Sequence, residues 1–363
     1  MLTSASASTL TPPAGPALAT TTIDSLALET FTHIIKYVND PLKPSWTASA
    51  SLVARSWRNP CQRVLFEDVK IQFTSYATEG DDGTVCYPDP VPWQALVARP
   101  YPPRRVIFDY SGARPLAVGC PALLLCRGVR ILTLKSAQIK LRVLEDENLQ
   151  ELARLHLILV SDIPVETSDQ EIVLPPKLQS LIVTLSDPQN FLRDMSPPHP
   201  PLTRALSIFN VPQICHRAFT FRIPSPYTCD RAGVSTSFRA LLGAMLPTEL
   251  SMTFSHEWSM EYVEELLHLL PKLIQTFHVK MDLTRFAGIG ADTLFRPFLE
   301  LLSSNQLPEL SVFRADFTKV QSGTQEEILA QGDHLDGRVE SPQIELRNLC
   351  KERSIKLFLW ELE

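Results

Sequence analysis

Several short groups of residues in this chain carry side chains that perform catalysis in many enzymes. Ser255-His256-Glu257 places a hydroxyl, an imidazole and a carboxylate in sequence, and Cys215-His216 joins a thiol to a base. Gly288-Ile289-Gly290 supplies two of the three glycines of a dinucleotide-binding loop. A catalytic site needs a nucleophile, an oriented base and donors for developing charge, so each group must be judged by its surroundings.

None of these groups has the surroundings that catalysis requires. No second histidine occurs four residues after His256, as a zinc protease would need, and the glycine pair is better interpreted as a turn. Cys215, His216 and Cys229 lie in a proline-rich stretch, which is a poor platform for a preorganised nucleophile. His268 lies in an apolar helical pattern that favours a core or flanking histidine over a ligand. The sequence therefore predicts a non-catalytic protein without a cofactor or metal.

Composition narrows the possible partners. The chain has 363 residues, of which 44% are hydrophobic, enough for one small and one large domain. Lys and Arg total 34 against 40 Asp and Glu, a net charge of -6, and no basic block is present, which argues against a nucleic-acid partner. No apolar run reaches the length of about 18 residues that spans a membrane.

The cysteines and the first residues indicate a reducing compartment. The 7 cysteines are scattered without zinc-site spacing, so free thiols are expected. Residues 1–22 are rich in Ser, Thr, Ala and Pro, and they lack both the basic start of a secretory signal and the arginines of a mitochondrial leader. We interpret them as a disordered tail, and we expect the protein in the cytoplasm and/or the nucleus.

Residues 23–73 are predicted to form a small helical domain. Apolar residues at helical offsets line one side of a first helix, which ends at the turn around Pro41 and Pro44. A second helix covers roughly Trp46 to Ser56. Asn59 is predicted to be an N-cap with Pro60 at the first position of a third helix. Alternation of Val69, Ile71 and Phe73 then predicts a strand.

This region resembles a known family. The segment SLVARSWRNPCQRVLFEDVKI (Ser51 to Ile71) is similar to the second half of an F-box, and LALETFTHIIKYV (Leu26 to Val38) is similar to its first half, as found in the expanded F-box families of fungi. Ala27 stands where that family usually has proline, and Thr30 where it usually has an aliphatic residue. The resemblance implies that these helices bind the Skp-type adaptor of a cullin-RING ubiquitin ligase and that the rest of the chain selects a target protein. The residues it assigns to the adaptor are Leu26, Leu28, Phe31, Ile34, Ile35, Val38, Leu52, Val53 and Trp57.

Residues 74–103 are predicted to be a linker or a cap. Glu79 to Gly83 is acidic and flexible, and repeated prolines stiffen the residues after Gly83, with a short helix expected at Trp93 to Ala98.

From Arg104 to the end, residues 104–363, a pair of apolar residues separated by one position returns at intervals in the middle twenties. Such a period predicts a leucine-rich-repeat-like solenoid. The pairs are Val106/Phe108, Leu132/Leu134, Leu155/Leu157, Leu181/Val183, Leu206/Ile208, Leu250/Met252, Phe277/Val279, Leu310/Val312 and Leu357/Leu359.

The match to the leucine-rich-repeat pattern is partial. The asparagine ladder is absent, and Pro212 to Arg239 is expected to be an exposed loop that interrupts the period. Helices are predicted at Glu261 to Leu270 after the cap Ser259, and at Thr293 to Leu302 after the cap Asp292. The predicted fold class is α/β, with a three-helix F-box-like unit followed by an irregular solenoid of parallel strands with helices outside. A non-repeating α/β domain is the alternative.

Strand alternation predicts which side chains meet a target. If the paired apolar residues point into the core, the residues between and beside them face the concave surface. The predicted target-binding residues are Lys135, His156, Phe209, His278, Lys280, Phe313, Phe358 and Trp360, with Thr133 and Thr184 among their neighbours.

Two functions of different classes remain open. The first is a substrate-recognition subunit of a cullin-RING ubiquitin ligase, with the target unidentified. The second is a non-catalytic scaffold protein whose F-box-like helices only cap the solenoid. An ordinary helical hairpin at the start of a globular domain is the plain interpretation of residues 26–73.

Overall fold

A computed structural model describes part of this chain. The described residues are 30, 49, 55–65, 67–72, 78–79, 85–86, 102–110, 121–136, 141–159, 172–185, 200–223, 231–254, 258–282, 291–318 and 342–361. The chain divides into two compact units, Met1–Phe66 and Glu67–Glu363. The predicted boundaries at residues 73 and 103 differ from this division, because the strand around Ile71 belongs to the second unit.

The first unit contains helix α3 (Arg55–Leu65), in which Cys61 and Val64 are buried and Trp57 is half-buried. The prediction that Asn59 caps a helix starting at Pro60 is wrong. The helix begins at Arg55 and passes through Pro60, because the fixed φ of proline suits a helix and only one backbone hydrogen bond is forfeited. Thr30 and Ser49 are helical and exposed. Apart from Trp57, the predicted adaptor-binding residues lie outside the described residues.

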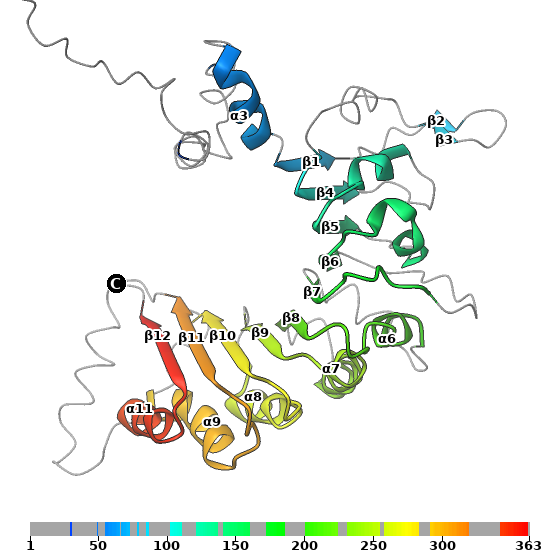
Figure 1. Ribbon diagram of the computed structural model, residues 1–363. Coiled ribbons are helices and arrows are strands. Elements are labelled where there is room, and N and C mark those ends of the chain that lie inside the picture. The colour runs from blue at the N-terminus through cyan, green and yellow to red at the C-terminus, as the bar shows by residue number, and fades with distance from the viewer. Residues whose placement is uncertain are drawn as a thin grey trace, which may run out of the picture. The chain divides into compact units, whose positions relative to one another are not determined.

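The second unit is a parallel sheet of ten strands that follow one another in chain order (Figure 1). All nine pairings are parallel. This order confirms the α/β solenoid. The strands are β1 (Asp68–Gln72), β4 (Arg105–Tyr110), β5 (Ile131–Ser136), β6 (Arg154–Leu159), β7 (Ser180–Leu185), β8 (His216–Ile223), β9 (Glu249–Phe254), β10 (Thr276–Asp282), β11 (Val312–Thr318) and β12 (Lys356–Glu361).

Helices lie along one face of this sheet (Figure 1). After β4 the described connectors are short 3-10 helices, η2 (Pro121–Cys126), η3 (Leu141–Glu145) and η4 (Glu147–Leu149). From β7 onward they are α-helices, α6 (Pro200–Ser207), α7 (Arg231–Met245), α8 (Met260–Leu267), α9 (Ala291–Ser303) and α11 (Pro342–Glu352). Strands β2 (Thr78–Glu79) and β3 (Val85–Cys86) form a small antiparallel pair within residues 74–103, the region predicted to be a linker or a cap.

One row of apolar side chains crosses all ten strands. The register places Ile71, Phe108, Leu134, Leu157, Val183, Phe219, Leu250, Phe277, Phe313 and Leu357 side by side. All of them are buried except Leu357, which is half-buried on the last strand of the sheet. This continuous row is the core that stacks one repeat on the next.

Backbone carbonyls join the repeats where an asparagine ladder would be expected. The carbonyl of Arg104 accepts hydrogen bonds from the N–H groups of Arg130 and Ile131, and the carbonyl of Arg130 accepts from Ala153 and Arg154. The carbonyls of Ala153, Thr248 and Gln275 repeat this double bond to the next unit. The backbone N–H groups at the start of these strands are therefore hydrogen-bonded to main-chain carbonyls of the preceding repeat, and no asparagine side chain is needed for this purpose.

The second half of the core is rich in stacked aromatic rings. Phe221 stacks on Phe219 with ring centroids 5.8 Å apart and on Phe238 of α7 at 5.1 Å. Phe313 stacks similarly on Phe277 at 5.7 Å and meets Phe298 of α9 at 5.8 Å. These rings attach α7 and α9 to the strands by large apolar contacts.

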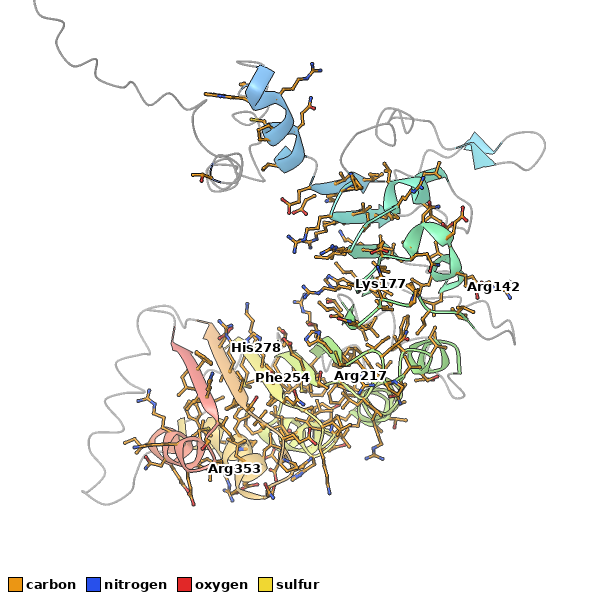
Figure 2. The ribbon with its side chains drawn as sticks, viewed as in Figure 1. Arg142, Lys177, Arg217, Phe254, His278 and Arg353 are labelled. Atoms are coloured by element: carbon orange, nitrogen blue, oxygen red, sulfur yellow. The ribbon has the colours of Figure 1, made fainter. Side chains whose placement is uncertain are left out.

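Polar side chains cap the helix ends that face the next repeat. The Gln306 side-chain amide donates to the carbonyls of Leu267 and His268 at the end of α8. The Arg353 guanidinium, labelled in Figure 2, donates to the carbonyl of Leu302 in the last turn of α9 and to the carbonyl of Leu307 after this helix. These side chains add donors to carbonyls at and just after the helix ends, where the helix itself supplies no i+4 partner; those of Leu267, Leu302 and Leu307 also accept a backbone N–H three residues on.

Three details of the repeat prediction are wrong. Leu206 belongs to helix α6, and the strand of that repeat is β8, with Phe219 and Phe221 as the core pair. The range Pro212 to Arg239 is consequently not one exposed loop, because it contains β8 and the start of α7. In β11 the core pair is Phe313 and Ala315, three residues beyond the predicted pair Leu310/Val312, and a shift by an odd number of residues reverses the faces of a strand.

The two helices predicted within the solenoid, at Glu261 to Leu270 and Thr293 to Leu302, agree with α8 and α9 within a few residues. Ser259 is the N-cap of α8, as predicted. Asp292 lies inside α9, which begins at Ala291, so its predicted role as a cap is wrong. The short helix expected at Trp93 to Ala98 lies outside the described residues.

Candidate functional site

The sheet face opposite helices α7, α8, α9 and α11 is the candidate site, and we call it the front face. It consists of the strand residues that alternate with the core row. One row of the front face runs Lys70, Ile107, Thr133, His156, Ile182, Ala218, Glu249, Thr276, Val312 and Lys356, and a second runs Gln72, Asp109, Lys135, Ile158, Thr184, Thr220, Ser251, His278, Arg314 and Phe358.

Asp109 organises the front face of the first strands. Its carboxylate is buried, with only 4% of the side chain exposed, and it lies 3.3 Å from the Lys135 ammonium and 3.5 Å from the Lys70 ammonium. The two lysines come from the strands on either side, β1 and β5. A buried carboxylate needs such partners, because burying an unpaired charge is costly.

His156 occupies a different environment two strands from Asp109. Its Nε2 lies 3.0 Å from the Thr184 hydroxyl on β7. Burial, together with the nearby Arg105 guanidinium, lowers the pKa of His156 below its ordinary value. This histidine therefore favours the neutral form in the folded protein.

The second half of the front face carries two similar hydrogen-bonded chains. On β7 to β9, the Ser180 hydroxyl lies 2.8 Å from His216 Nδ1, and His216 Nε2 lies 3.1 Å from Glu249 Oε2. On β9 to β11, Ser251 lies 3.4 Å from His278 Nδ1, and His278 Nε2 lies 2.8 Å from Asp316 Oδ2. Figure 2 labels His278 on β10. Each chain connects three adjacent strands.

These chains place a hydroxyl, an imidazole and a carboxylate in the order that hydrolases use, but the surroundings do not suit a nucleophile. An acyl-transfer site needs free donors beside the hydroxyl to hold an oxyanion. The backbone N–H of Ser180 donates to the Ala153 carbonyl, and β7 is paired on both sides. We therefore interpret the two chains as polar connections between strands.

The structure separates the predicted target-binding residues into three groups. Lys280 and Phe358 are exposed on the front face, while Lys135, His156 and His278 are half-buried there. Phe209 comes just after helix α6, and Phe209 and Phe313 are both only 1% exposed, so placing them on a target-binding surface is wrong. Thr133 is likewise buried. Trp360 belongs to β12, and its side chain lies outside the described part of the structure.

Sequence reasoning missed several front-face residues. The sequence pattern assigns no role to His216, whereas the structure places it between Ser180 and Glu249. Positions more than thirty residues apart meet only through the strand register, which the spacing of apolar pairs does not provide at β8. The alternation of Phe219, Phe221 and Ile223 is the signal that could have located this strand.

The charge of the front face is opposite to that of the whole chain. By strand alternation it carries eight basic residues, Lys70, Arg105, Lys135, Arg154, Arg222, Lys280, Arg314 and Lys356. It carries five acidic residues, Asp68, Asp109, Glu249, Asp282 and Asp316. The whole chain has 34 basic and 40 acidic residues, so the front face concentrates positive charge.

Thiol, metal and membrane chemistry receive no support from the described residues. Cys61, Cys126 and Cys350 are free and buried, and Cys215 is free and exposed. Burial raises the pKa of the Cys350 thiol to about 11, although Arg353 opposes the shift, so the thiol is a poor nucleophile. Among these residues no cluster of possible metal ligands occurs, and no helix is long and apolar enough to cross a membrane.

The other candidate groups are only partly described. His268 is exposed at the end of α8 and lies 3.2 Å from the side chain of Gln306, which agrees with a flanking histidine. The segments Ser255-His256-Glu257 and Gly288-Ile289-Gly290, together with Cys229, lie outside the described residues.

Comparisons with known proteins do not assign a family. No family model matches the chain, and no curated protein matches it. Among solved structures, the leucine-rich repeat-containing protein LegL7 from Legionella pneumophila is similar, with a TM-score of 0.38 and 12% identity over 80% of this chain and 90% of that chain. A likeness this distant carries no argument about function. The solenoid assignment rests on the strand order and register alone.

Proposed function

We propose that this chain is a non-catalytic substrate receptor of a cullin-RING ubiquitin ligase. Its N-terminal helices bind a Skp-type adaptor, and the front face of the solenoid binds the protein to be ubiquitylated. The observation that carries the proposal is the F-box-like segment Ser51 to Ile71 together with the division of the chain between Phe66 and Glu67. That division leaves a short first unit, which contains α3, before a large repeat unit, and this is the modular order expected of a receptor.

Helix α3 supplies the local support. Trp57 is half-buried on the same side of the helix as the buried Cys61 and Val64, which follow it by four and seven residues. A unit of this size builds only a small core of its own. Each anchor that becomes buried against an adaptor contributes on the order of 1.5 to 3 kcal/mol.

The solenoid supports the second part of the proposal. Ten parallel strands present a continuous front face of polar, charged and scattered apolar side chains, including exposed Phe358 and Lys280. Extended surfaces built from stacked repeats suit the binding of another protein. The chemistry of the front face offers recognition groups, while the backbone donors that catalysis would need are used within the sheet.

The test is co-purification of the full chain with a Skp-type adaptor. We expect Trp57→Ala combined with Phe31→Ala to weaken adaptor binding by roughly a hundredfold or more, since two anchors are lost. Arg58→Ala is the matched control, because Arg58 is exposed on the same helix. Circular dichroism and the thermal unfolding of the repeat unit would check that the double variant remains folded.

Unchanged recovery of the adaptor with the folded double variant would contradict the proposal. Absence of adaptor from the wild-type purification would also contradict it and would favour a scaffold protein. Loss of adaptor with Arg58→Ala as well as with the double variant would show that the anchors are not specific.

A further inference from the structure

We propose that the front face binds an acidic segment of a partner protein and that Arg105, Arg154, Lys280 and Lys356 contact its carboxylates. This inference rests on the proposed role of the front face in target recognition, and it adds the chemical class of the segment that is recognised.

Three of the five acidic residues of the front face are paired with neighbouring side chains. Asp109 is held by Lys70 and Lys135 at 3.5 and 3.3 Å. Asp316 lies 2.8 Å from His278 and 3.4 Å from the Arg314 guanidinium. Glu249 lies 3.1 Å from His216. Asp109 is therefore balanced by two ammonium groups and Asp316 by a guanidinium, so these two carboxylates offer little attraction to a basic partner.

Four basic residues on the same face have no acidic partner within the described part of the chain. Arg154, Lys280 and Lys356 are exposed. Arg105 is half-buried, and its Nε is enclosed without a hydrogen-bond partner. An unpaired donor of this kind costs free energy in the free protein, so an arriving carboxylate that orders the guanidinium gains more there than at a solvated lysine.

The unpaired residues form two groups whose spacing suits an extended peptide. Arg105 and Arg154 lie on β4 and β6, two strands apart, and Lys280 and Lys356 lie on β10 and β12, also two strands apart. Neighbouring strands are about 4.8 Å apart, so Arg105 and Arg154, which share one register row, are separated by roughly 10 Å. Lys280 lies four residues further along its strand than the row of Lys356, so this pair is separated by roughly 16 Å. An extended chain covers these distances in about three and about five residues at a rise of roughly 3.3 Å per residue.

The arrangement favours separated carboxylates over the continuous charge of a nucleic acid. Asp109, Glu249 and Asp316 lie among the basic residues, and the front face has only three more basic than acidic positions. A phosphate backbone would pass close to these carboxylates, whereas acidic side chains spaced along a peptide can avoid them. The partner class is therefore an acidic peptide segment.

The test is fluorescence anisotropy of the full chain with a fluorescein-labelled peptide of repeated Glu-Gly-Gly units. We expect saturable binding that weakens as salt rises from about 50 to about 300 mM. Arg105→Glu combined with Arg154→Glu should raise the Kd about tenfold or more. Arg239→Glu combined with Lys272→Glu is the matched control, because these residues are exposed away from the front face, on α7 and in the turn before β10. The control should leave the Kd within about twofold.

Equal loss in both double variants would overturn the inference, because it would show attraction to net charge alone. Binding of a labelled single-stranded RNA as tightly as the peptide would overturn the choice of partner class. Thermal unfolding of each variant would check folding, and Arg105→Gln combined with Arg154→Gln, a milder change, should still weaken peptide binding several-fold.

The failure of this inference can be distinguished from the failure of the proposed function. If the adaptor co-purifies but the peptide does not bind, the acidic partner is wrong and the receptor proposal stands. If the peptide binds with the expected pattern but no adaptor is recovered, the front-face inference stands and the receptor proposal is wrong.

Discussion

The first and second halves of the sheet stack their repeats with different connectors and different core residues. In the first half, β1 and β4 to β7, the described connectors are 3-10 helices of 3 to 6 residues, and the core row is mainly aliphatic. In the second half, β8 to β12, the connectors are α-helices of 8 to 15 residues, and stacked phenylalanines join them to the strands. The core row of apolar side chains stays continuous across both halves. Connector length therefore changes what covers the helix-bearing face of each repeat, and the register between strands is preserved.

The front face differs between the halves in the same way. The histidine of the first half, His156, has a hydroxyl partner and a nearby arginine. The histidines of the second half, His216 and His278, have carboxylate partners. Histidine therefore lies near a cationic guanidinium in the first half of the sheet and beside carboxylates in the second half.

The largest effect is expected from breaking the aromatic core of the second half. Phe221 is fully buried and stacks on Phe219 and Phe238. Phe221→Ala should lower the free energy of unfolding by roughly 3 to 5 kcal/mol, because a large cavity forms between β8 and α7. Urea denaturation followed by circular dichroism measures this change. Phe221→Leu, which keeps most of the volume, is the control and should cost clearly less.

A loss below about 1 kcal/mol for Phe221→Ala would contradict the account of the second half. It would mean that α7 is attached to the sheet by contacts other than the aromatic stack.

A smaller effect is expected where the helix of one repeat is capped from the next. Arg353 donates to the carbonyls of Leu302 and Leu307 and to the side chain of Asn305. Arg353→Ala should reduce the free energy of unfolding by roughly 1 to 3 kcal/mol, since the carbonyls of Leu302 and Leu307 lose their charged donor and keep only backbone bonds of 3.4 and 3.3 Å. Lys351→Ala, at an exposed position of α11, should change it by less than about 0.5 kcal/mol. Equal effects of the two substitutions in thermal or urea unfolding would show that Arg353 is not a cap.

The smallest effect is expected in the pH dependence of the free energy of unfolding, where His156 should differ from His216 and His278. Because the pKa of His156 is lowered in the folded state, the unfolded chain binds more protons as pH falls through the ordinary histidine value of about 6.5. This histidine therefore subtracts more stability as pH falls, and the loss reaches its full, constant value below the lowered folded-state pKa. His156→Gln should make the free energy of unfolding depend less on pH between about 7.5 and 5.5. Identical slopes for the variant and the wild type would contradict the assignment.

Regular spacing predicts much of the sheet, and irregular units explain the errors. The strands at Leu132/Leu134, Leu155/Leu157 and Leu181/Val183 are predicted correctly because short connectors keep the period constant. Leu206 and Ile208 imitate a strand pair, although Leu206 lies in helix α6. At β11, Leu310 and Val312 have the expected spacing, but Phe313 and Ala315 enter the core.

The front-face contacts are harder to predict because they depend on register. Strand alternation predicts Lys135 and His278 as front-face residues, but it does not identify their partners Asp109 and Asp316. Alternation fixes which face a residue occupies, and only the alignment of neighbouring strands fixes what it meets. For the same reason the charge excess of the front face could not be obtained from the net charge of the chain.

The measurement that tests the central claim most directly is sedimentation velocity of the full chain mixed with a purified Skp-type adaptor. The receptor account predicts a stable one-to-one complex with wild-type protein and free components with the Trp57→Ala and Phe31→Ala double variant. Two independent species in the wild-type mixture would contradict the account, whatever the solenoid binds.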